Sequence, residues 1–424
     1  MSDVFAELEW RGFVQQATPE VQSHLAGGRR TVYCGFDPTA PSLQLGNLMP
    51  IMLLRHLQLG GHRPLVLMGG GTGLIGDPSG KRNERPLLSE EQIRENLRHQ
   101  RDQMQHFLDF DGKDTGALVL NNADWLVEQR LVGFLRDVGK HFSVNVMMQK
   151  ESVKGRLDAG ISYTEFSYML LQAYDFLHLF RDPRYRCTMQ VGGSDQWGNI
   201  TAGVDLIRRV EGGEAHGLVA PLVTTASGAK FGKSEAGAIW LDPTLTSPYK
   251  LYQFWYNTDD RDVAAYLKLF TLLTRDTIAA LVDSHAKDPG RREAQAKLAI
   301  EVTTMVHGKD AAHNATAVNA ILFSDLDPRE VEPSALELLA QEIPTSSAPG
   351  RDAMSLVDAV VQAGLVKSKS EARRAIEQGG IYVNQQRENG VDRKIESRDW
   401  IRSQYLLLRK GKKDYALLRV PSPG

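Results

Sequence analysis

Two lysines with a spacing suited to anion binding lie in GAKFGKS, residues 228–234. Lys230 and Lys233 are three residues apart with Gly232 between them, so one turn could bring both ammonium groups to the same anion. Such a loop suits a leaving pyrophosphate, because catalysis of phosphoryl chemistry is mostly positioning and charge stabilisation. Taken alone, the same residues are also typical of a solvated lysine turn.

A second candidate lies in PSLQLGNL, residues 41–48. The strand-like TVYCGF precedes it and the helical MPIMLLRHLQLGG follows, with Gly46 at the junction. A glycine turn at a helix N-terminus is where a nucleotide phosphate binds. The flanking side chains, Gln44 and Asn47, are amides that donate hydrogen bonds without carrying charge. The stretch is therefore either a working variant of a phosphate site or the remnant of one.

The glycine-rich segment GTGLIG, residues 71–76, fits a dinucleotide-binding fingerprint. That fingerprint needs a helix to begin at the glycines, whereas the turn-forming DPSG follows here. We expect instead a loop that lets backbone approach a ligand, with Asp77 at its tip and Lys81, Arg82 and Arg85 as a cationic flap. A simple surface turn is the alternative interpretation.

Polar residues also mark a buried helix and the end of a strand. Tyr168, Gln172 and Asp175 share one face of YMLLQAYDFLHLF, whose other residues are mostly apolar. Buried polar groups need partners, which either a polar ligand or an internal network would supply. Asp195 and Gln196 follow the strand-like MQV and a glycine pair, and ligands bind at such carboxyl ends of parallel strands.

The elements that must position these residues follow from hydrophobic patterning. Residues 30–220 alternate short aliphatic runs with amphipathic stretches, which predicts a parallel sheet covered by helices. Residues 247–323 have the pattern of successive helices, and the proline-containing, small-residue stretch at 344–351 suggests a linker. Ser368 and Glu371 have capping-box spacing before a short helix, and a strand and a hairpin follow.

Composition narrows the class of protein. A length of 424 residues, 42% of them hydrophobic, predicts two or three globular domains. No apolar run approaches the ~20 residues of a membrane span, and the N-terminus lacks a signal-peptide pattern. Two cysteines, Cys34 and Cys187, form no disulfide framework, which favours the cytoplasm.

Charge is distributed unevenly along the chain. Residues 351–424 contain 15 Lys and Arg against nine Asp and Glu, a net charge of +6, whereas the preceding 350 residues have a net charge of −8. A basic terminal piece on an acidic body suggests a module that binds a polyanion, although a solvated basic surface has the same composition.

In order and spacing, these segments resemble the class I aminoacyl-tRNA synthetases, in particular the bacterial tyrosyl-tRNA synthetase family. CGFDPTA followed by LQLGN resembles the first class I signature, usually His-Ile-Gly-His, and KFGKS resembles the second, usually Lys-Met-Ser-Lys-Ser. GDPSGK, the YxxxQxxD pattern and GGSDQWGNIT are similar to the tyrosyl members. The tail from about residue 352 is similar to a small RNA-binding fold shared with a ribosomal protein.

The resemblance implies an α/β fold with the following domains: a Rossmann-type catalytic domain (1–222), a lysine signature loop region (223–246), an α-helical anticodon-side domain (247–323), a linker (324–351) and a ribosomal-protein-like RNA-binding domain (352–424). It implies activation of L-tyrosine with Mg²⁺-ATP to tyrosyl-adenylate and transfer to tRNA(Tyr). It also implies a cytoplasmic homodimer with no membrane association, no protein-bound metal and an apolar interface near residues 125–165.

Residue roles carried over by matching positions form three groups. Tyrosine would be bound by Tyr33, Asp77, Tyr168, Gln172, Asp175 and Gln196. ATP would be bound by Gly35, Asp37, Gly46, Asn47, Gly193, Asp195, Lys230, Lys233 and Ser234, and the catalytic set that faces its phosphates would be Thr39, Gln44, Lys81, Arg85, Lys230 and Lys233. The tRNA would contact Lys367, Lys369, Arg373 and Arg374.

Three alternatives follow from the same residues. A tryptophan-activating relative would share the subfold, but Tyr33 and Asp175 suit a hydroxyl. A catalytically impaired RNA-binding paralogue is suggested by the Gln44 and Asn47 signature. A nicotinamide-dependent oxidoreductase is suggested by GTGLIG alone.

Overall fold

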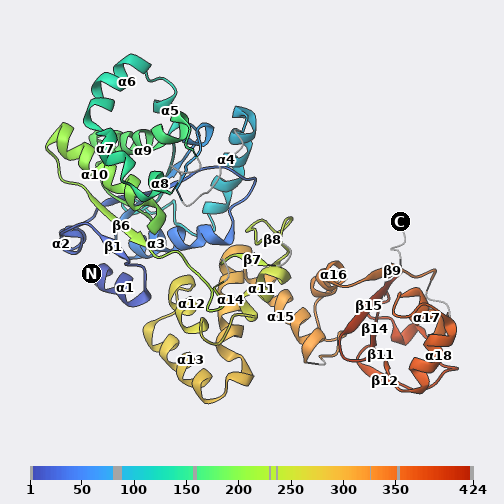
Figure 1. Cartoon of the computed structure of the whole chain (residues 1–424). Helices are drawn as coiled ribbons and strands as arrows, with labels where there is room; N and C mark the ends of the chain where they lie inside the picture. The colour runs from blue at the N-terminus through green and yellow to red at the C-terminus, as the bar shows by residue number, and fades with distance from the viewer. Residues whose placement is uncertain are drawn as a thin grey trace. The chain divides into compact units, whose positions relative to one another are not determined.

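The computed structural model describes residues 3–79, 88–155, 160–228, 231–234, 237–324, 326–350 and 354–420. The chain forms two compact units (Figure 1). Unit 1 consists of Met1–Thr246 and Thr258–Leu298, and unit 2 of Ser247–Asn257 and Ala299–Gly424. The helical region expected at 247–323 is therefore divided between them.

The centre of unit 1 is a six-stranded sheet, in the order β1-β6-β5-β2-β3-β4. Its strands are β1 (Gln16–Ala17), β2 (Thr31–Phe36), β3 (Arg63–Met68), β4 (Leu118–Asn121), β5 (Cys187–Gly193) and β6 (His216–Ala220). All neighbours are parallel except β1, which pairs antiparallel with β6 at one edge. The predicted parallel sheet is confirmed, and the three aliphatic runs expected as strands are β2, β3 and β4.

The strand order fixes where a ligand can bind. From β2 the chain continues to β3 on one side, whereas β5 lies on the other side of β2. The order therefore reverses between β2 and β5, and open α/β sheets bind ligands outside the carboxyl ends of strands at such a switch point. These strands end at Phe36 and Gly193, next to the candidate residues Asp37 and Asp195.

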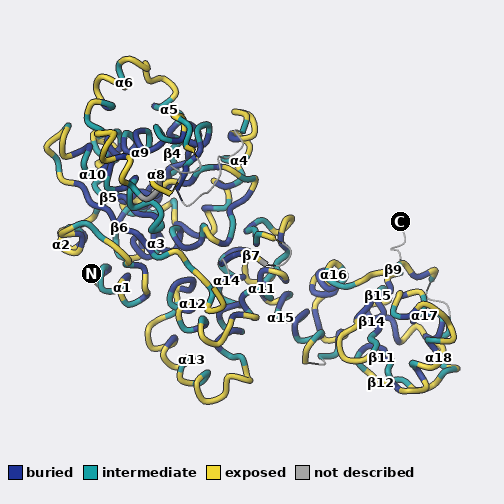
Figure 2. The backbone as a smooth tube through the Cα atoms, viewed as in Figure 1, coloured by how far each residue is buried: buried dark blue, intermediate teal, exposed yellow. Residues whose placement is uncertain are grey.

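Helices cover the sheet of unit 1. α3 (Leu48–Leu59) is buried along most of its length and packs on β2, β3 and β5. α9 (Tyr163–Arg181) and α10 (Trp197–Glu211) pack on each other and share a core with Tyr33 and Leu65. Figure 2 colours the backbone by the burial of each residue. The other α-helices that lie in or begin in this unit are α1 (Val4–Arg11), α2 (Val21–Ala26), α4 (Glu90–Met104), α5 (Ala123–Leu126), α6 (Leu131–Asp137), α7 (Val144–Met148), α8 (Glu151–Lys154), α12 (Val263–Phe270), α13 (Arg275–Lys287) and α14 (Glu293–His307).

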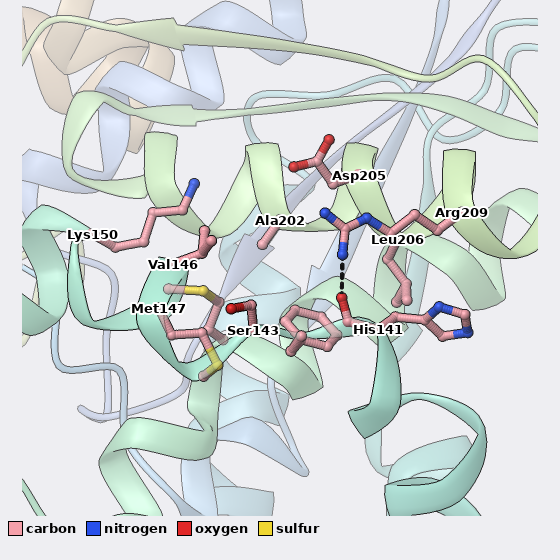
Figure 3. Close-up of a pocket in the computed structure, with 11 residues that line it drawn as sticks. His141, Ser143, Val146, Met147, Lys150, Ala202, Asp205, Leu206 and Arg209 are labelled. Carbon is pink, nitrogen blue, oxygen red and sulfur yellow. Dashed lines mark hydrogen bonds between the residues drawn. The ribbon is translucent and has the colours of Figure 1, made fainter.

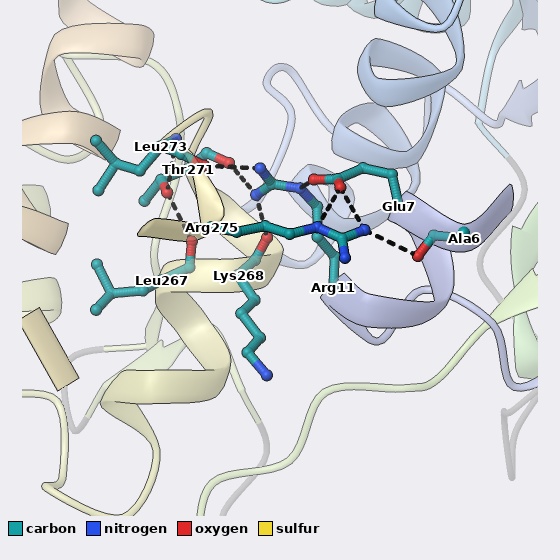
Figure 4. Close-up of polar contacts among 8 residues, drawn as sticks. All are labelled: Ala6, Glu7, Arg11, Leu267, Lys268, Thr271, Leu273 and Arg275. Atoms are coloured by element: carbon teal, nitrogen blue, oxygen red, sulfur yellow. Dashed lines mark hydrogen bonds and ion pairs between the residues drawn. The ribbon is translucent and has the colours of Figure 1, made fainter. Parts of the chain in front are cut away.

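A buried arginine joins the first helix to the end of α12 (Figure 4). Arg11 is 5% exposed and donates to the carbonyl oxygens of Lys268, Thr271 and Leu273 at 2.8, 2.9 and 2.7 Å. Its Nε also donates to Glu7 Oε1 at 2.7 Å. The last carbonyls of a helix lack intrahelical partners, so this guanidinium caps α12.

Unit 2 combines helices with a five-stranded sheet in the order β12-β11-β14-β15-β9. Its elements are α11 (Pro248–Tyr256), α15 (Lys309–Phe323), α16 (Pro333–Glu342), β9 (Thr345–Ser347), β10 (Met354–Ser355), α17 (Leu356–Gln362), α18 (Lys369–Glu377), β11 (Ile381–Val383), β12 (Gln386–Glu388), β13 (Lys394–Ile395), β14 (Tyr405–Lys410) and β15 (Asp414–Arg419). Helices α17 and α18 pack on this sheet through a shared apolar core. The predicted α+β fold of the C-terminal part is confirmed.

The segment 324–351, expected to be a linker, is partly folded. It contains α16, and its strand β9 pairs in parallel with β15, with Thr345 opposite Leu417. Small polar residues are typical of linkers, but their backbone N–H and C=O groups pair as well as any others at a sheet edge. None of the described helices is long and apolar enough to cross a membrane.

Candidate active site

The two signature segments lie against each other in unit 1. Leu45 N donates to Ile239 O at 2.9 Å, and Ile239 N donates to Gly232 O at 3.0 Å. Gly232 has φ +76°, and a Cβ there would lie 3.4 Å from Gly46 N. The loop that carries Lys233 is thus in contact with the turn that begins α3, as a shared phosphate site requires.

Gly46 is the residue of this turn that has open space where a side chain would begin. Among the described residues, no heavy atom lies within 4 Å of the position a Cβ would take at Gly46. The protein's own packing therefore does not demand glycine here, whereas a ligand that approaches the backbone would. Asn47 Oδ1 accepts a hydrogen bond from Gln44 N at 2.8 Å, so Asn47 would donate to a ligand only through Nδ2.

Asp37 follows β2 and joins two elements of the predicted pocket. Its Oδ2 accepts a hydrogen bond from Tyr168 Oη at 2.9 Å, and its Oδ1 accepts one from Thr72 Oγ1 at 2.8 Å. A Cβ at Gly69 would lie 2.0 Å from Asp37 Oδ1, so the adjacent glycine makes room for the carboxylate. Gly35 and Thr39, on either side along the chain, are exposed.

A polar network brings Asp77, Gln172 and Gln196 together. Gln196 Nε2 donates to Asp77 Oδ2 at 2.7 Å, and Gln172 Nε2 donates to Gln196 Oε1 at 3.2 Å. The buried Asn199 donates to Gln172 Oε1 at 3.0 Å. The network places the carboxylate of Asp77 among amide side chains, which suits the binding of a small cation.

The deepest part of the site contains Tyr33 and Asp175, which are 1% and 2% exposed. Asp175 accepts hydrogen bonds from Asn122 Nδ2 at 2.9 Å and Trp125 Nε1 at 2.7 Å. Burial raises the pKa of Asp175 to about 7, against the lowering effect of these two donors. Tyr33 Oη is buried with no hydrogen-bond partner among the described residues.

An unpartnered buried hydroxyl is costly, and a polar ligand at this position would satisfy it. The ring of Tyr33 meets that of Phe176, the residue after Asp175, with centroids 5.2 Å apart. Burial, and after it the charge of Asp175, raises the pKa of Tyr33. A ligand hydroxyl placed between them could accept from Tyr33 and donate to Asp175. This part of the site is therefore complementary to an alcohol or a phenol.

The comparison with known sequences identifies the family. The family described as tRNA synthetases class I (W and Y) matches residues 26–324, and the Tyrosine--tRNA ligase SYY-like C-terminal domain matches residues 335–418. The tyrosine--tRNA ligase of Anaeromyxobacter dehalogenans strain 2CP-1 is 50% identical over 422 residues, which cover 99% of this chain and 100% of that protein.

The chain belongs to the tyrosine--tRNA ligase family.

Comparisons with other members of the family support this assignment. Tyrosine--tRNA ligase 1 of Bacillus subtilis is 46% identical over 422 residues, 99% of each chain. A C-terminally truncated mitochondrial tyrosyl-tRNA synthetase of Aspergillus nidulans is similar in structure, with a TM-score of 0.69, 30% identity, and coverage of 76% of this chain and 95% of that chain. The resemblance found in the sequence is thereby confirmed at the level of the family.

Several residues that shape this family's site here were not singled out from the sequence. Asn122 and Trp125 hold Asp175, and Asn199 holds Gln172. Asn122 follows the carboxyl end of β4, so the strand-end rule applied to Asp195 could have found it. Trp125 and Asn199 carry no such signal, because an indole and a lone amide are as common in ordinary cores.

The predicted nucleotide residues Gly193 and Asp195 lie at the end of β5. A Cβ at Gly193 would lie 2.7 Å from Asp195 Oδ1 and 3.4 Å from Leu222 Cδ2, so this glycine keeps the carboxylate and the leucine close together. Leu222 is 58% exposed and was not predicted, yet it offers an apolar surface beside the carboxylate.

The GTGLIG segment does not open an α-helix. It forms the single 3-10 turn Thr72–Leu74, and the next α-helix among the described residues is α4, which begins at Glu90. This geometry disfavours the dinucleotide fingerprint, as the sequence predicted.

Part of the predicted set lies outside the described residues, namely Lys81, Arg82, Arg85 and Lys230. Lys233 is exposed and pairs with Ala238 in a short hairpin of β7 (Lys233–Ser234) and β8 (Gly237–Ala238). Ser234 pairs with Gly237 through the backbone in the same hairpin.

The four predicted tRNA contacts lie in unit 2, with Lys367 just before α18 and the other three within it. Ser368 Oγ accepts from Glu371 N at 3.2 Å and caps the helix, as predicted. Lys367, Lys369, Arg373 and Arg374 are all exposed. Lys369 Nζ forms an ion pair with Asp358 Oδ1 at 2.7 Å, so its charge is partly neutralised within the protein.

A pocket on unit 1 lies between α7 and α10, and none of its lining residues was predicted to bind tyrosine, ATP or tRNA (Figure 3). Arg209 Nη1 donates to the backbone oxygen of His141 at 2.5 Å across it, and Lys150 Nζ donates to Thr201 Oγ1 at 3.0 Å. These cationic groups are thus engaged within the protein, and the pocket shares no lining residue with the network around Asp77.

Proposed function

We propose that this chain activates L-tyrosine with ATP and then transfers it to the 3′ end of tRNA(Tyr). The observation that carries the proposal is the buried, unpartnered Tyr33 Oη, whose ring packs against Phe176, the residue after the buried Asp175. The phenol of tyrosine could accept from Tyr33 and donate to Asp175, whereas phenylalanine offers neither a donor nor an acceptor, and the indole N–H of tryptophan could donate but not accept. Tyrosine-dependent exchange of pyrophosphate into ATP tests this choice, with phenylalanine and tryptophan as competing substrates.

The remaining tyrosine contacts follow from the polar network. Asp77, Gln172 and Tyr168 would hold the ammonium group, and Gln196 would lie nearest the carboxylate. Because Gln196 is bonded to both Asp77 and Gln172, these side chains orient one another. A preformed network of this kind lowers the entropy lost when substrate binds.

The activation step forms one bond and breaks another. A carboxylate oxygen of tyrosine attacks the α-phosphorus of Mg²⁺-ATP, and the bond from that phosphorus to the bridging oxygen of pyrophosphate breaks. No general base is needed, because the attacking carboxylate is already ionised at neutral pH. In the second step a terminal ribose hydroxyl of tRNA attacks the tyrosyl carbonyl carbon and forms an ester. The bond from that carbon to the phosphate oxygen breaks, AMP leaves, and the hydroxyl proton is released to AMP or to solvent.

The two contacting signature segments would hold ATP. Gly46 would let the phosphates approach backbone, with Gln44, Asn47 and Thr39 as donors. Asp195 and Gly193 would face the ribose, with Leu222 against the base. Gly35 and Asp37 would complete this part of the site. Charge that develops on pyrophosphate would be stabilised by Lys233 and Ser234 and by Lys81, Arg85 and Lys230. Mg²⁺ would enter with ATP as part of the substrate.

The impaired-paralogue alternative makes a distinct prediction, namely tRNA binding without tyrosine-dependent exchange. The contacts among Gln196, Asp77 and Gln172 argue against it, because a chain released from catalysis has no reason to keep a satisfied substrate network. We also infer a cytoplasmic location, which is consistent with Cys34 and Cys187 both being free and buried.

We further propose a homodimer through the surface of α5, α6, α7 and the start of α9. Eight large hydrophobic residues with exposed side chains lie here in the described chain: Val127, Leu131, Val132, Leu135, Val144, Val146, Met148 and Tyr163. Apolar surface of this extent is typical of an interface between subunits.

Replacing both Leu131 and Val132 with aspartate is expected to convert the dimer to a monomer, because each would place a charge in the apolar contact. Analytical ultracentrifugation measures the change. Leu59→Asp is the matched control, since Leu59 is similarly exposed but lies on α3. An unchanged sedimentation coefficient for the double variant would refute this interface.

Charge reversal of Arg373 and Arg374 together is expected to weaken aminoacylation at low tRNA concentration and reduce its salt dependence. The slope of log affinity against log salt concentration is negative, and each lost phosphate contact makes it less steep by about 0.7–0.9. Pyrophosphate exchange should be unaffected. Charge variants are preferable to deletion of residues 351–424, because Tyr415 Oη donates to Leu322 O within unit 2. Arg398→Glu is the surface control, and an equal loss there would contradict a role specific to α18.

A further inference from the structure

The lysine loop contains one buried aromatic residue. Phe231 is 7% exposed and stacks on Phe270 of α12, with ring centroids 5.1 Å apart and planes 5° apart. It also meets the ring of Tyr266 edge-on at 5.3 Å. We call Phe231, Tyr266 and Phe270 the aromatic anchor. A ring buried in an otherwise polar loop fixes the loop at that residue.

Helix α12 also holds the chain that enters the loop. Tyr266 Oη donates to Thr224 O at 3.4 Å, and Ala226 N donates to Asp262 Oδ2 at 2.9 Å. The loop is therefore attached to α12 both before and at Phe231. The end of α12 is itself fixed by Arg11, whose three bonds to carbonyl oxygens join it to α1 (Figure 4).

Gly232, the residue that follows Phe231, faces the proposed phosphate site. Gly232 O accepts from Ile239 N at 3.0 Å, and Gly232 packs against Leu45 and Gly46. Lys233 comes next and is exposed. The anchor thus fixes the backbone at Gly232. This residue immediately precedes the exposed Lys233 and lies close to the turn that begins α3.

We propose that Phe231 is a positioning residue for tyrosine activation, and that it acts through Lys233. With the ring seated on α12, the backbone of Gly232 has one position, and Lys233 reaches the pyrophosphate from it. Without the ring, the loop would retain its lysines but place them less accurately. The inference rests on the proposed function, because it concerns the phosphate end of the same reaction.

Single-turnover formation of tyrosyl-adenylate measures the effect. Phe231→Ala is expected to lower the rate constant by about 10–100-fold, as small misplacements of catalytic groups do. The dissociation constant for tyrosine should be unchanged, because the tyrosine network contains no residue of the anchor. Phe231→Met should restore most of the rate, since a thioether packs well on aromatic rings.

A double-mutant cycle with Lys233→Ala separates positioning from general stability. If Phe231 acts through Lys233, adding Phe231→Ala to Lys233→Ala will cost little further rate. Leu269→Ala is the matched control, because this buried residue of α12 lies 3.8 Å from the Cβ position of Gly12, on the side facing α1. It should leave the rate of adenylate formation near that of the wild type.

The possible failures are distinguishable. Wild-type protein without tyrosine-dependent exchange would refute the proposed function. Wild-type exchange together with a normal rate in Phe231→Ala, or additive losses in the double variant, would overturn only the role of Phe231. An equal loss in Leu269→Ala would also overturn it, because the effect would then come from disturbing α12.

Discussion

Replacing Asp175 with asparagine is expected to lower kcat/KM for tyrosine in pyrophosphate exchange by about 10–150-fold, since a hydrogen bond to a charged group contributes about 1.5–3 kcal/mol. The amide presents one acceptor where the carboxylate presents two oxygens. Asn122 and Trp125 already donate to those oxygens, so the substrate phenol would meet an N–H or compete for the single oxygen.

The same substitution is expected to change the pH dependence of stability. Burial raises the pKa of Asp175 from 3.8 to about 7, so the folded state retains the proton at pH values where the unfolded state has released it. The contribution of Asp175 to the stability of the wild type therefore falls as the pH rises from 4 to 7, by up to about 4 kcal/mol. Asparagine does not titrate, so the variant should gain stability relative to the wild type over this range.

Denaturant unfolding between pH 4.5 and 8, together with pyrophosphate exchange, measures both effects. Asp182→Asn is the control, because it makes the same chemical change at the end of the same helix. The hydrogen bonds from Arg184 lower the pKa of Asp182 to about 2, so this variant should show no growing difference above pH 5. If the Asp175→Asn difference stays constant with pH, the buried carboxyl does not titrate as described.

Gln44→Ala is the substitution with the second large expected effect. We expect it to lower the rate of adenylate formation by about 10²–10³-fold, which is the usual result of losing one preorganised donor. The backbone of Gln44 bonds to Asn47 through both its N–H and its C=O, and these bonds survive the substitution. The turn should therefore keep its shape while losing only the side-chain amide.

Rapid-quench measurement of adenylate formation tests this, with tyrosine affinity as a second readout that should not change. Gln44→His should remain active, because an imidazole N–H also donates, and Gln22→Ala is an exposed glutamine control. A normal rate in Gln44→Ala would show that the amide does not face the phosphates. The expected loss would mean that the neutral signature is a working variant of the phosphate site.

The sheet and the helix face that carries the candidate site residues could be predicted because their signals are local. The aliphatic runs that became β2, β3 and β4 have strand composition in themselves, and Tyr168, Gln172 and Asp175 follow helical spacing. The contact of Tyr168 with Asp37 could not be predicted, because these residues are 131 positions apart and only the packing of α9 beside β2 brings them together.

Two further features, the pairing of residues 345–347 and the division of residues 247–323, also depend on contacts between distant parts of the chain. Residues 345–347 are small and polar, and nothing in them reveals that the last strand of the chain provides an edge to pair with. The division of 247–323 likewise depends on which surfaces the helices bury. Composition predicts helices there, but α12 packs with α1 and α3 whereas α11 packs with α15.

The position of β15 has a consequence for synthesis. This strand ends at Arg419 and lies between β14 and β9 in the finished sheet. On a ribosome, β9 is made well before its partner β15, and it has an unpaired edge until β15 emerges. Unit 2 therefore cannot complete its sheet until β15 has been made, and a polypeptide that terminates before β15 presents an open strand edge that a protease or chaperone can recognise.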